Sequence, residues 1–359
     1  MEYRLAHYRR LRDFAATTEP EGGVPGSAAP GGAPRFVIQQ HDATCLHWDL
    51  RLEHEGALVS WALPRGIPWR PKDNRLAVHT EDHPLEYLEF HGEIPAGQYG
   101  AGTMTIWDRG TYETGTFSDD KVVVTLHGER VDGTYALFPI DGRDWMVHRM
   151  DPPQDPERRP LPADLRPMLG LPGDLPSDGE AWAFEVLWPG ARVLVTNDAG
   201  RVTISRADGS EVSECFPEVR RMGRSLAGVE AILDAVIVAV DASGQPLTDP
   251  SNVERRLAAR DERKARRLAE ERPAAAMFFD LLWLEGHATT GLTYADRRIL
   301  LADLQLAGPA WQTPAHHRGE GDALLEVARA RDLPGLVAKR LDSIYLPGQT
   351  MTAWRVVAA

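Results

Sequence analysis

Residues 39–52, QQHDATCLHWDLRL, gather side chains that could do chemistry inside a segment that favours a β-strand. Its second half and the residue that follows it are polar at every other position, at His47, Asp49, Arg51 and Glu53. In an extended strand such positions share one face, and the apolar residues between them occupy the other. The imidazoles of His41 and His47 and the carboxylate of Asp49 suit a divalent transition metal such as Mn²⁺ or Zn²⁺.

The arginine beside these three residues indicates what a metal would act on. Arg51 lies one strand repeat, about 7 Å, from Asp49. There its guanidinium could fork onto a phosphate held by the metal. The alternative is a solvated strand face of mixed charge. We favour the metal site, because two imidazoles and a carboxylate beside an arginine are an expensive choice for solubility alone.

A second group of polar side chains lies in residues 74–90, NRLAVHTEDHPLEYLEF. It comprises Arg75, His79, Glu81, Asp82, His83 and Tyr87. Six of the twelve histidines of the chain fall between positions 41 and 91. A single histidine is more often structural, and we expect this of His54 and His91. His83 is a candidate for acid–base chemistry, since a protonated imidazole near phosphate could stabilise charge or protonate a leaving oxygen.

The segment GQYGAGT, residues 97–103, has the glycine content of a phosphate-binding loop. However, the alternating strand pattern MTIWDRG follows it, whereas a phosphate-cradling loop leads into a helix. We therefore expect these glycines to shape a turn.

Short strands are the elements that must position these residues. The strand patterns cover residues 35–40, 47–64, 75–80, 103–108, 121–128 and 134–140. Alternating with tight turns, they predict a small antiparallel barrel or sandwich. Residues 17–35, rich in Gly, Pro and Ala, are expected to be a mobile arm or lid. Residues 150–180 are proline-rich, and we place the domain boundary there, near Pro160.

Beyond this boundary, strand patterns mix with helical ones. Residues 191–198 and 231–241 are strand-like, which predicts an α/β or α+β domain. Residues 251–273 have the pattern of one highly charged helix. Its acids and bases are interspersed, and Val253, Leu257 and Leu268 could face a core. A solvated surface helix is therefore favoured over a nucleic-acid-binding one.

Composition narrows the classes of function. The chain has 359 residues, enough for two domains, and its net charge of −13 argues against a generally basic DNA-coating module. Its two cysteines, Cys45 and Cys215, are too few for a disulfide framework or a cysteine-ligated zinc site, and we expect both to be reduced core thiols. No apolar run is long enough to span a membrane and no signal peptide is evident, so we expect a cytoplasmic protein.

Three long segments of the N-terminal half carry a family resemblance. They are YRRLRDFAATTEPEG (8–22), FVIQQHDATCLHWDLRLEHEGALVSWALPRG (36–66) and RLAVHTEDHPLEYLEFHGEIPAGQYGAGTMTIWDRGTYE (75–113). Together they resemble the 3′-phosphoesterase domain of the bacterial DNA ligase D family. The resemblance implies a compact β-barrel that trims damaged 3′ ends during non-homologous end joining. Such a domain removes 3′-phosphates and terminal ribonucleotides and leaves a 3′-hydroxyl.

The resemblance also implies roles for single residues. The implied manganese ligands are His41, His47 and Asp49. The implied groups around the scissile phosphate are Arg51, Arg65, Arg75 and His83, with Arg65 at a position where many relatives have lysine. Supporting positions fall on Gln39, Glu81 and Tyr87, and the arm used in ribonucleotide removal on Arg12, Asp13 and Glu19. The implied reaction is Mn²⁺-assisted phosphoester hydrolysis, in which arginines neutralise the phosphate and His83 assists proton transfer.

The second half, residues 166–359, resembles the adenylation domain of ATP-dependent DNA ligases of the same kind. The segments that carry this resemblance lie at 166–195, 204–219, 232–241, 278–286 and 335–349. The expected fold class is therefore mixed and β-rich, an antiparallel barrel followed by an α+β nucleotidyltransferase-like domain without an OB-fold. The expected parts are an arm (1–35), a barrel (36–150), a linker (151–165) and the ligase-like domain (166–359).

This domain departs from its family where the chemistry should be. The nucleophile motif of the family is Lys-x-Asp-Gly, and here EVLWPGAR puts Leu187 at the lysine and Pro189 at the aspartate. Uncharged residues also replace two glutamates, at Val236 and Pro334, and two lysines, at Val356 and Ala358. Neither Lys264 nor Lys339 matches the nucleophile position. Leucine cannot form a phosphoramide with AMP, so we expect no ATP-dependent covalent adenylation.

Two functions remain open for the whole chain. The favoured one is a Mn²⁺-dependent 3′-end-healing phosphoesterase with a catalytically dead ligase-like half. The alternative is a non-enzymatic adaptor that binds DNA ends in a repair complex. The ligase-like half would be a docking or end-binding platform, or a remnant that stabilises its neighbour. The implied partners are DNA 3′ ends or primer-templates, some with terminal ribonucleotides, and also Ku and a separate ligase or polymerase, in the cytoplasm at the nucleoid and without a membrane.

Overall fold

The computed structural model describes residues 4–23, 32–226, 228–259 and 261–359. The chain divides into two compact units, Met1–Pro156 and Glu157–Ala359. Arg158, inside the predicted linker 151–165, is already held by the second unit, because its Nη1 donates to the backbone oxygen of Glu285 at 2.8 Å. The finer division into arm, barrel, linker and ligase-like domain stays a prediction.

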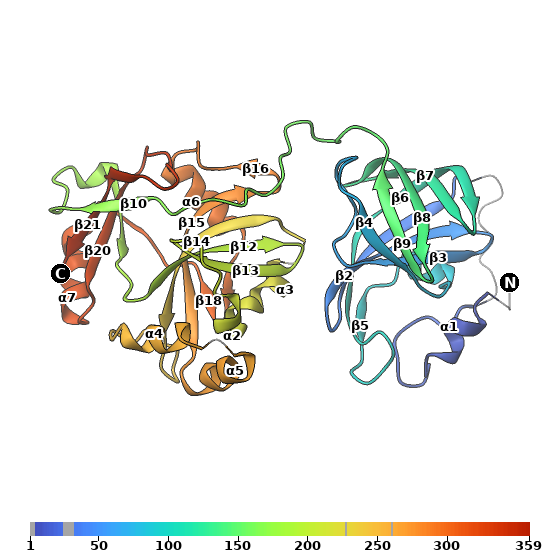
Figure 1. The fold of residues 1–359 in the computed structure, drawn as a ribbon, viewed down its shortest axis with the longest axis horizontal. Coiled ribbons are helices and arrows are strands. Elements are labelled where there is room, and N and C mark those ends of the chain that lie inside the picture. The colour runs from blue at the N-terminus through green and yellow to red at the C-terminus, as the bar shows by residue number, and fades with distance from the viewer. Residues whose placement is uncertain (1–3, 24–31, 227, 260) are drawn as a thin grey trace. The chain divides into compact units, whose positions relative to one another are not determined.

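The first unit is a closed antiparallel barrel (Figure 1). Its strands are β1 (Arg35–Asp42), β2 (Leu46–His54), β3 (Ala57–Leu63), β4 (Arg75–His79), β5 (Gly92–Ile94), β6 (Gly102–Ser118), β7 (Lys121–Gly128), β8 (Asp132–Asp141) and β9 (Asp144–Arg149). They pair in the order β1-β2-β3-β4-β9-β8-β7-β6, and β6 pairs again with β1, so eight strands close the ring. Glu55 and Gly56, with φ of 49° and 83°, form the tight turn between β2 and β3. The predicted barrel is confirmed.

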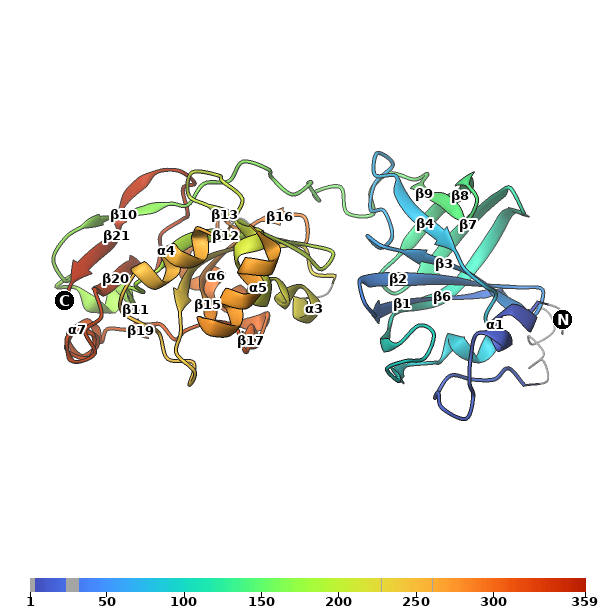
Figure 2. The same ribbon diagram turned by 60° about the horizontal axis from the view of Figure 1, so that its bottom comes forward.

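The two faces of β1 and β2 have different surroundings. The side chains that fill the barrel include Trp48, Leu50 and Leu52, each at most 3% exposed. The opposite face is covered by the helix α1 (Ala6–Arg10) and the 3-10 helix η1 (Leu85–Leu88), from which Tyr8 and Tyr87 pack against Val37. Figure 2 shows α1 beside the barrel. The face with the candidate chemistry is therefore partly enclosed by segments outside the sheet.

The second unit contains two sheets. The larger has the order β13-β12-β14-β15-β18-β17, with β16 beside β15, and the smaller has the order β10-β21-β20-β11-β19. Their strands are β10 (Leu169–Pro172), β11 (Trp182–Val186), β12 (Ala191–Asp198), β13 (Arg201–Arg206), β14 (Ala231–Ala239), β15 (Ala274–Leu284), β16 (His287–Ala288), β17 (Ala307–Gly308), β18 (Trp311–Gln312), β19 (His317–Arg318), β20 (Gly335–Arg340) and β21 (Thr350–Ala358). The helices are η2 (Gly179–Ala181), η3 (Ser213–Cys215), α2 (Pro217–Arg220), α3 (Met222–Leu226), α4 (Ser251–Leu257), α5 (Glu262–Glu271), α6 (Tyr294–Asp303) and α7 (Gly321–Ala330).

These sheets and helices form layers. On one face of the larger sheet lie α2 and α4, which pack through Val219 and Val253 (Figure 1). The other face packs against the smaller sheet, where Trp354 of β21 and Leu194 of β12 belong to one core cluster. Leu325 of α7 packs on the far side of the smaller sheet. The predicted α+β nucleotidyltransferase-like fold is confirmed.

The charged segment 251–273 differs from the single helix that we predicted. It forms two helices, α4 and α5, and α5 begins after Asp261, whose carboxylate accepts from the backbone nitrogen of Lys264 at 2.9 Å. An aspartate at this position caps a helix start, which explains the break. In α4, Arg256 is fully buried and donates to both oxygens of Glu218 at 2.6 and 2.9 Å. Most of α5 is exposed, as expected for a surface helix.

The structure also bears on two expectations drawn from composition. Cys215 is buried, but Cys45 is exposed, so the prediction of a core thiol is wrong for Cys45. Its position in the short link between β1 and β2 explains the exposure, since such turns face solvent. Among the described residues, no helix has the length and apolar character needed to cross a membrane.

Candidate functional site

Three candidate metal ligands converge at one end of β1 and β2. His41 and His47 are directly opposite each other in the strand pairing, and Asp49 is the next residue on the same face of β2. His41 Nδ1 lies 3.6 Å from Asp49 Oδ2, and His47 Nε2 lies 3.6 Å from Asp49 Oδ1. One donor atom from each residue falls within 4.8 Å of the others. In the part of the chain that the structure describes, no other group of three such donors comes together.

The backbone orients both imidazoles toward this centre. His41 Nε2 lies 2.9 Å from the carbonyl oxygen of Gly100, and His47 Nδ1 lies 3.0 Å from that of Cys45. A carbonyl oxygen only accepts, so these nitrogens carry protons, and a neutral imidazole then directs the lone pair of its other nitrogen at Asp49. Lone pairs facing a carboxylate repel unless a cation lies between them. The donor set and its supporting carbonyls therefore fit a divalent metal.

Arg51 supports the carboxylate and keeps one donor available. Its Nη2 donates to Asp49 Oδ2 at 3.0 Å, and its Nε donates to Gln39 Oε1 at 2.7 Å. Gln39 is fixed in turn by the backbone oxygens of Tyr87 and Phe90. Burial alone would raise the pKa of Asp49, but the neighbouring groups, Arg51 foremost, outweigh it and lower that pKa to about 2. Arg51 Nη1 is buried without a hydrogen-bond partner among the described residues, as a donor reserved for an anion would be.

His83 is held as a neutral imidazole beside this centre. Its Nδ1 donates to the backbone oxygen of Glu81 at 2.8 Å, and its Nε2 faces Arg12 Nη2 at 3.3 Å. Burial, and then the nearby charges of Arg51 and Arg12, lower its pKa well below the usual value for histidine. Burial and the two arginines therefore disfavour the protonated imidazole that we expected from the sequence.

The described part of the N-terminal arm reaches into the site. Arg12 Nε pairs with Glu19 at 2.6 Å, and its Nη1 pairs with Glu81 at 3.0 Å. The hydroxyl of Tyr87 donates to the same Glu19 carboxylate. Asp13, in contrast, is exposed and accepts from the backbone nitrogen of Ala15 at 3.1 Å, so it is not brought to the cluster. Of the predicted mobile stretch 17–35, residues 24–31 lie outside the described residues.

Arg65 and Arg75 lie together near the start of β4. The side chain of Arg75 donates from Nη1 to the backbone oxygen of Arg65 and, at 2.9 Å, to that of Ile67. Arg75 thus holds the turn that carries Arg65, whose side chain is exposed. Both arginines belong to the loop and strand that follow β3, so the structure groups them with each other; their role at a phosphate stays a prediction.

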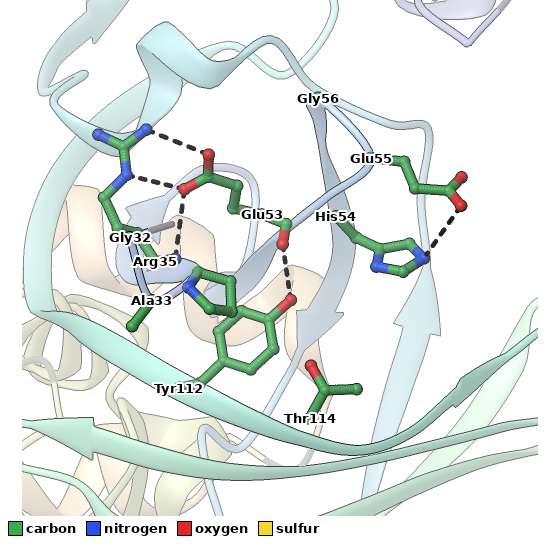
Figure 3. A pocket seen from close by; sticks show the side chains of 10 residues that line it. Gly32, Ala33, Arg35, Glu53, His54, Glu55, Gly56, Tyr112 and Thr114 are labelled. Carbon is green, nitrogen blue, oxygen red and sulfur yellow. Dashed lines mark hydrogen bonds and ion pairs between the residues drawn. The ribbon is translucent and has the colours of Figure 1, made fainter. Parts of the chain in front are cut away.

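Glu53 shares the polar face of β2 with the metal cluster but serves another place. Its carboxylate pairs with Arg35 Nε at 2.7 Å, and its backbone oxygen accepts from the hydroxyl of Tyr112 at 2.6 Å. These residues line a cavity of about 650 Å³ together with His54 and Thr114 (Figure 3). None of the three candidate metal ligands lines it.

Sequence reasoning missed two contributors to the site. Tyr8 is fully buried, and the centre of its ring lies 3.9 Å from the guanidinium carbon of Arg12, so the ring packs against that side chain. Gly100 supplies the carbonyl that orients His41. The glycine-rich stretch 97–103 was interpreted as a turn, and its positive φ at Gly97 and Gly100 agrees with that. A backbone carbonyl leaves no side-chain pattern, so nothing in the sequence could have singled it out.

The ligase-like half has its own cluster of buried charges. Lys339 Nζ lies 2.5 Å from a Glu185 oxygen, and 4.1 and 4.3 Å from the ring centres of Phe279 and Trp354. The other Glu185 oxygen accepts from the hydroxyl of Tyr294 at 2.5 Å. Burial lowers the pKa of Lys339, although the Glu185 carboxylate opposes that effect. Glutamate and lysine thus neutralise each other within an aromatic enclosure.

Of the six positions where the resemblance led us to expect charged residues, four lie on or beside neighbouring strands of the smaller sheet. Leu187 follows β11 and its backbone nitrogen donates to Gly335 at 2.9 Å; Val356 and Ala358 of β21 are opposite Val337 and Gly335 of β20. Pro334 immediately precedes β20 and accepts from the backbone nitrogen of Ala359 at 3.1 Å. Pro189 is buried, and the adjacent Trp188 packs with Val236 in one apolar cluster. Apolar side chains therefore gather where the family motif would place charges.

Comparisons with known proteins divide the chain at the same place. Residues 39–139 match the family described as "DNA Ligase D 3'-phosphoesterase domain", and residues 174–355 match "ATP dependent DNA ligase domain". The "Multifunctional non-homologous end joining protein LigD" of Mycolicibacterium smegmatis is 40% identical over 98% of this chain and 45% of its own length. The protein of that name from Pseudomonas aeruginosa is 30% identical over 95% of this chain and 45% of its own length.

A solved structure is also similar to part of this chain. The structure titled "mycobacterial DNA ligase D complexed with ATP and MES" is 32% identical, with a TM-score of 0.46, over 55% of this chain and 60% of its own. This chain spans less than half the length of the curated relatives named above. The two family matches and the identity across nearly the whole chain show that it belongs to the DNA ligase D family, with a 3′-phosphoesterase domain followed by an ATP-dependent ligase adenylation domain.

Proposed function

We propose that the barrel is a metal-dependent 3′-phosphoesterase that uses Mn²⁺ to remove 3′-phosphates and terminal ribonucleotides from DNA ends in bacterial non-homologous end joining. The observation that carries this proposal is the orientation of His41, His47 and Asp49 around one point, beside the unpartnered Nη1 of Arg51. The names of the relatives support end joining as the setting. Because those proteins are more than twice as long, the pathway is part of the proposal.

Each side chain has a defined part in the proposed hydrolysis, in which a water oxygen joins phosphorus and the bond to the 3′-oxygen breaks. His41, His47 and Asp49 would hold the ion, which when bound polarises the phosphate oxygens. Nη1 of Arg51 donates a hydrogen bond to a phosphate oxygen. Because Nη1 is buried, this hydrogen bond between charged groups is strong. His83 offers its Nε2 lone pair to the proton of the water. A nearby phosphate raises a histidine pKa, so the same ring can pass that proton to the 3′-oxygen.

The test is release of phosphate from a primer-template with a 3′-phosphate. The full chain should be active with MnCl2 and inactive with EDTA, and His41→Ala should abolish activity together with bound manganese. His91→Ala is the matched control, because His91 is exposed and lies outside the cluster. A manganese-loaded wild-type protein that binds the 3′ end without turnover would favour the adaptor instead.

We also propose that the ligase-like domain forms no covalent adenylate. Its membership in an ATP-dependent ligase family makes nucleotide binding a natural expectation, but the covalent step needs an amine at the position of Leu187. Val356 and Ala358 remove two further positive charges nearby. Lys339 is engaged with Glu185 and lies on another strand. Ends healed by the barrel would then need a separate ligase.

Radiolabelled ATP with Mg²⁺ or Mn²⁺ tests this second proposal. We expect no acid-stable adduct and no sealing of a nick, and no gain of either property in Leu187→Lys. Equilibrium dialysis with the same ATP separates loss of the covalent step from loss of binding. Label that peptide mapping traces to Lys264 or Lys339 would overturn the proposal and give the chain two activities.

A further inference from the structure

An exposed tyrosine stands at the edge of the candidate metal centre without a role so far. Tyr99 lies in the loop 95–101 between β5 and β6, and 46% of it is exposed. The next residue, Gly100, supplies the carbonyl that lies 2.9 Å from His41 Nε2. Tyr99 is therefore one residue away in the chain from a group that orients a metal ligand.

Glycines fix this loop in place. Gly97 and Gly100 have φ of 90° and 75°, values that favour glycine, and the backbone nitrogens of Gln98 and Ala101 donate to Pro95 and Gln98 at 3.1 and 3.2 Å. A Cβ on Gly102 would lie 2.4 Å from the backbone oxygen of Asp42, so the end of the loop packs against the end of β1. The backbone thus holds the ring of Tyr99 at the site, although the ring itself is open to solvent.

The neighbours of Tyr99 belong to the site. The guanidinium carbon of Arg12 lies 5.4 Å from the centre of its ring and 3.9 Å from that of Tyr8. Partial burial raises the pKa of the Tyr99 hydroxyl, and the negative charges of Glu81 and Asp49 act in the same direction. Tyr99 therefore lies within electrostatic reach of both the proton-handling group around Glu81 and the metal-binding carboxylate.

We propose that Tyr99 stacks on the base of the nucleotide that carries the 3′-phosphate. This inference rests on the proposed function, because it deepens the same site by naming how the strand end is recognised. Every base has an aromatic face, and stacking on a protein ring is sequence-tolerant, which suits an enzyme that must accept any 3′ end. The phosphate alone gives Arg51 and the metal nothing to distinguish DNA from other phosphoesters, whereas a stacked base does.

The experiment compares two substrates and three variants of the full chain. One oligonucleotide has an ordinary 3′-terminal nucleotide with a 3′-phosphate, and the other has an abasic 3′-terminal sugar with the same phosphate. Tyr99→Ala should raise KM on the base-bearing end by roughly tenfold and change KM on the abasic end by less than about twofold. Tyr99→Phe keeps the ring and should behave like wild type. Phe138→Ala is the control, since Phe138 is 41% exposed on β8, outside the cluster.

Other results would overturn the inference. If Tyr99→Ala weakens both substrates equally, Tyr99 positions Arg12 or the His41 loop and does not contact the base. Unchanged KM on both ends, or loss of bound manganese, is equally incompatible with stacking. If the wild-type protein releases no phosphate at all, the proposed function fails instead. Fluorescence anisotropy of the two labelled oligonucleotides with manganese then tests Tyr99 alone, with a roughly tenfold weaker Kd expected for Tyr99→Ala on the base-bearing end only.

Discussion

The two halves of this chain treat their buried charges in opposite ways. In the barrel, His41, His47 and Asp49 turn their donor atoms toward one point, and Arg51 keeps Nη1 without a partner. In the ligase-like half, Glu185 and Lys339 turn toward each other at 2.5 Å. The first arrangement is costly without an external cation and anion, whereas in the second the two opposite charges offset each other within the protein. The presence of buried charged residues is therefore a weaker sign of function than the direction in which their donors point.

The surroundings of the two clusters differ in the same sense. Each barrel imidazole is oriented by a backbone carbonyl, so the lone pairs stay directed at the centre. The positions around Glu185 that would carry charge in the family are occupied by aliphatic residues, among them Leu187 and Val356. Neither leucine nor valine offers an amine or a charged group at these positions. This contrast is what the proposed function requires, with the reacting site of the chain in the barrel.

The largest effect is expected when one candidate metal ligand is removed from the barrel. Asp49→Ala should lower the rate of 3′-phosphate release by roughly 10³-fold or more, since a bound Lewis acid is worth several kcal/mol. Bound manganese, measured by inductively coupled plasma mass spectrometry, should fall with it. Glu53→Gln is the matched control on the same strand face, because Glu53 pairs with Arg35. Equal losses in the two variants would remove the ligand assignment.

The next effect concerns stability and addresses the ligase-like half. Glu185→Ala leaves Lys339 buried without its carboxylate and should cost about 3 kcal/mol in free energy of unfolding. Hydrogen exchange of β11 and β20 in the full chain would report this locally. Replacing both residues, as Glu185→Leu with Lys339→Met, should recover most of the loss. Glu180→Ala is the control, and its exposed pair with Arg318, 3.8 Å apart, should be worth less than about 0.5 kcal/mol.

Local sequence patterns predicted some features of the fold and the site, and missed those that depend on distance or on strand pairing. Alternation in residues 47–53 correctly put Asp49 and Arg51 on one strand face. Alternation could not show that Glu53 serves a different place. Glu53 is six residues along the strand from His47, which is a distance of about 20 Å. The opposition of His41 and His47 depends on strand register, which the residue types and their spacing could not show. The break between α4 and α5 could be predicted from the sequence, because aspartate is a frequent residue at the start of a helix, as Asp261 is here.

Contacts between distant segments lay beyond any local pattern. Arg12 reaches Glu81 and His83, about seventy positions away, only because the arm packs on the barrel through Tyr8. The lowered pKa of His83 likewise depends on burial and on the charges of Arg51 and Arg12, which no stretch around residue 83 reveals. The sequence therefore predicted which residue types take part, but the structure was needed to show which protonation state they adopt.

A smaller effect is expected from the arm. Arg12→Ala breaks the pairs with Glu19 and Glu81 and should lower removal of a terminal ribonucleotide about tenfold more than release of a 3′-phosphate, in line with hydrogen bonds to charged groups. The two rates would be measured on primer-templates that differ only in the 3′ end. Arg9→Ala is the control. Among the hydrogen bonds of the described residues, the side chain of Arg9 donates only to the backbone oxygens of Glu21 and Gly22. Identical ratios in both variants would take the arm out of substrate selection.

The smallest expected effect is a pH dependence of stability caused by His83. Its pKa in the folded protein lies well below the usual value, because of burial and then of Arg51 and Arg12, although the hydrogen bond to the backbone oxygen of Glu81 opposes them. Below about pH 6.5 the unfolded chain takes up a proton that the folded chain refuses, so stability is complete above that pH and is lost as the pH falls. From pH 6.5 to 5.5 this amounts to about 1 kcal/mol for one histidine.

The experiment compares wild type with His83→Gln. His54 and His79 also have a lowered pKa and contribute a loss of stability of the same sign, which this comparison removes. Urea unfolding at the two pH values should show a loss about 1 kcal/mol smaller in the variant. Equal losses would mean that His83 titrates normally, and the protonated imidazole would then be available to the leaving oxygen from the start.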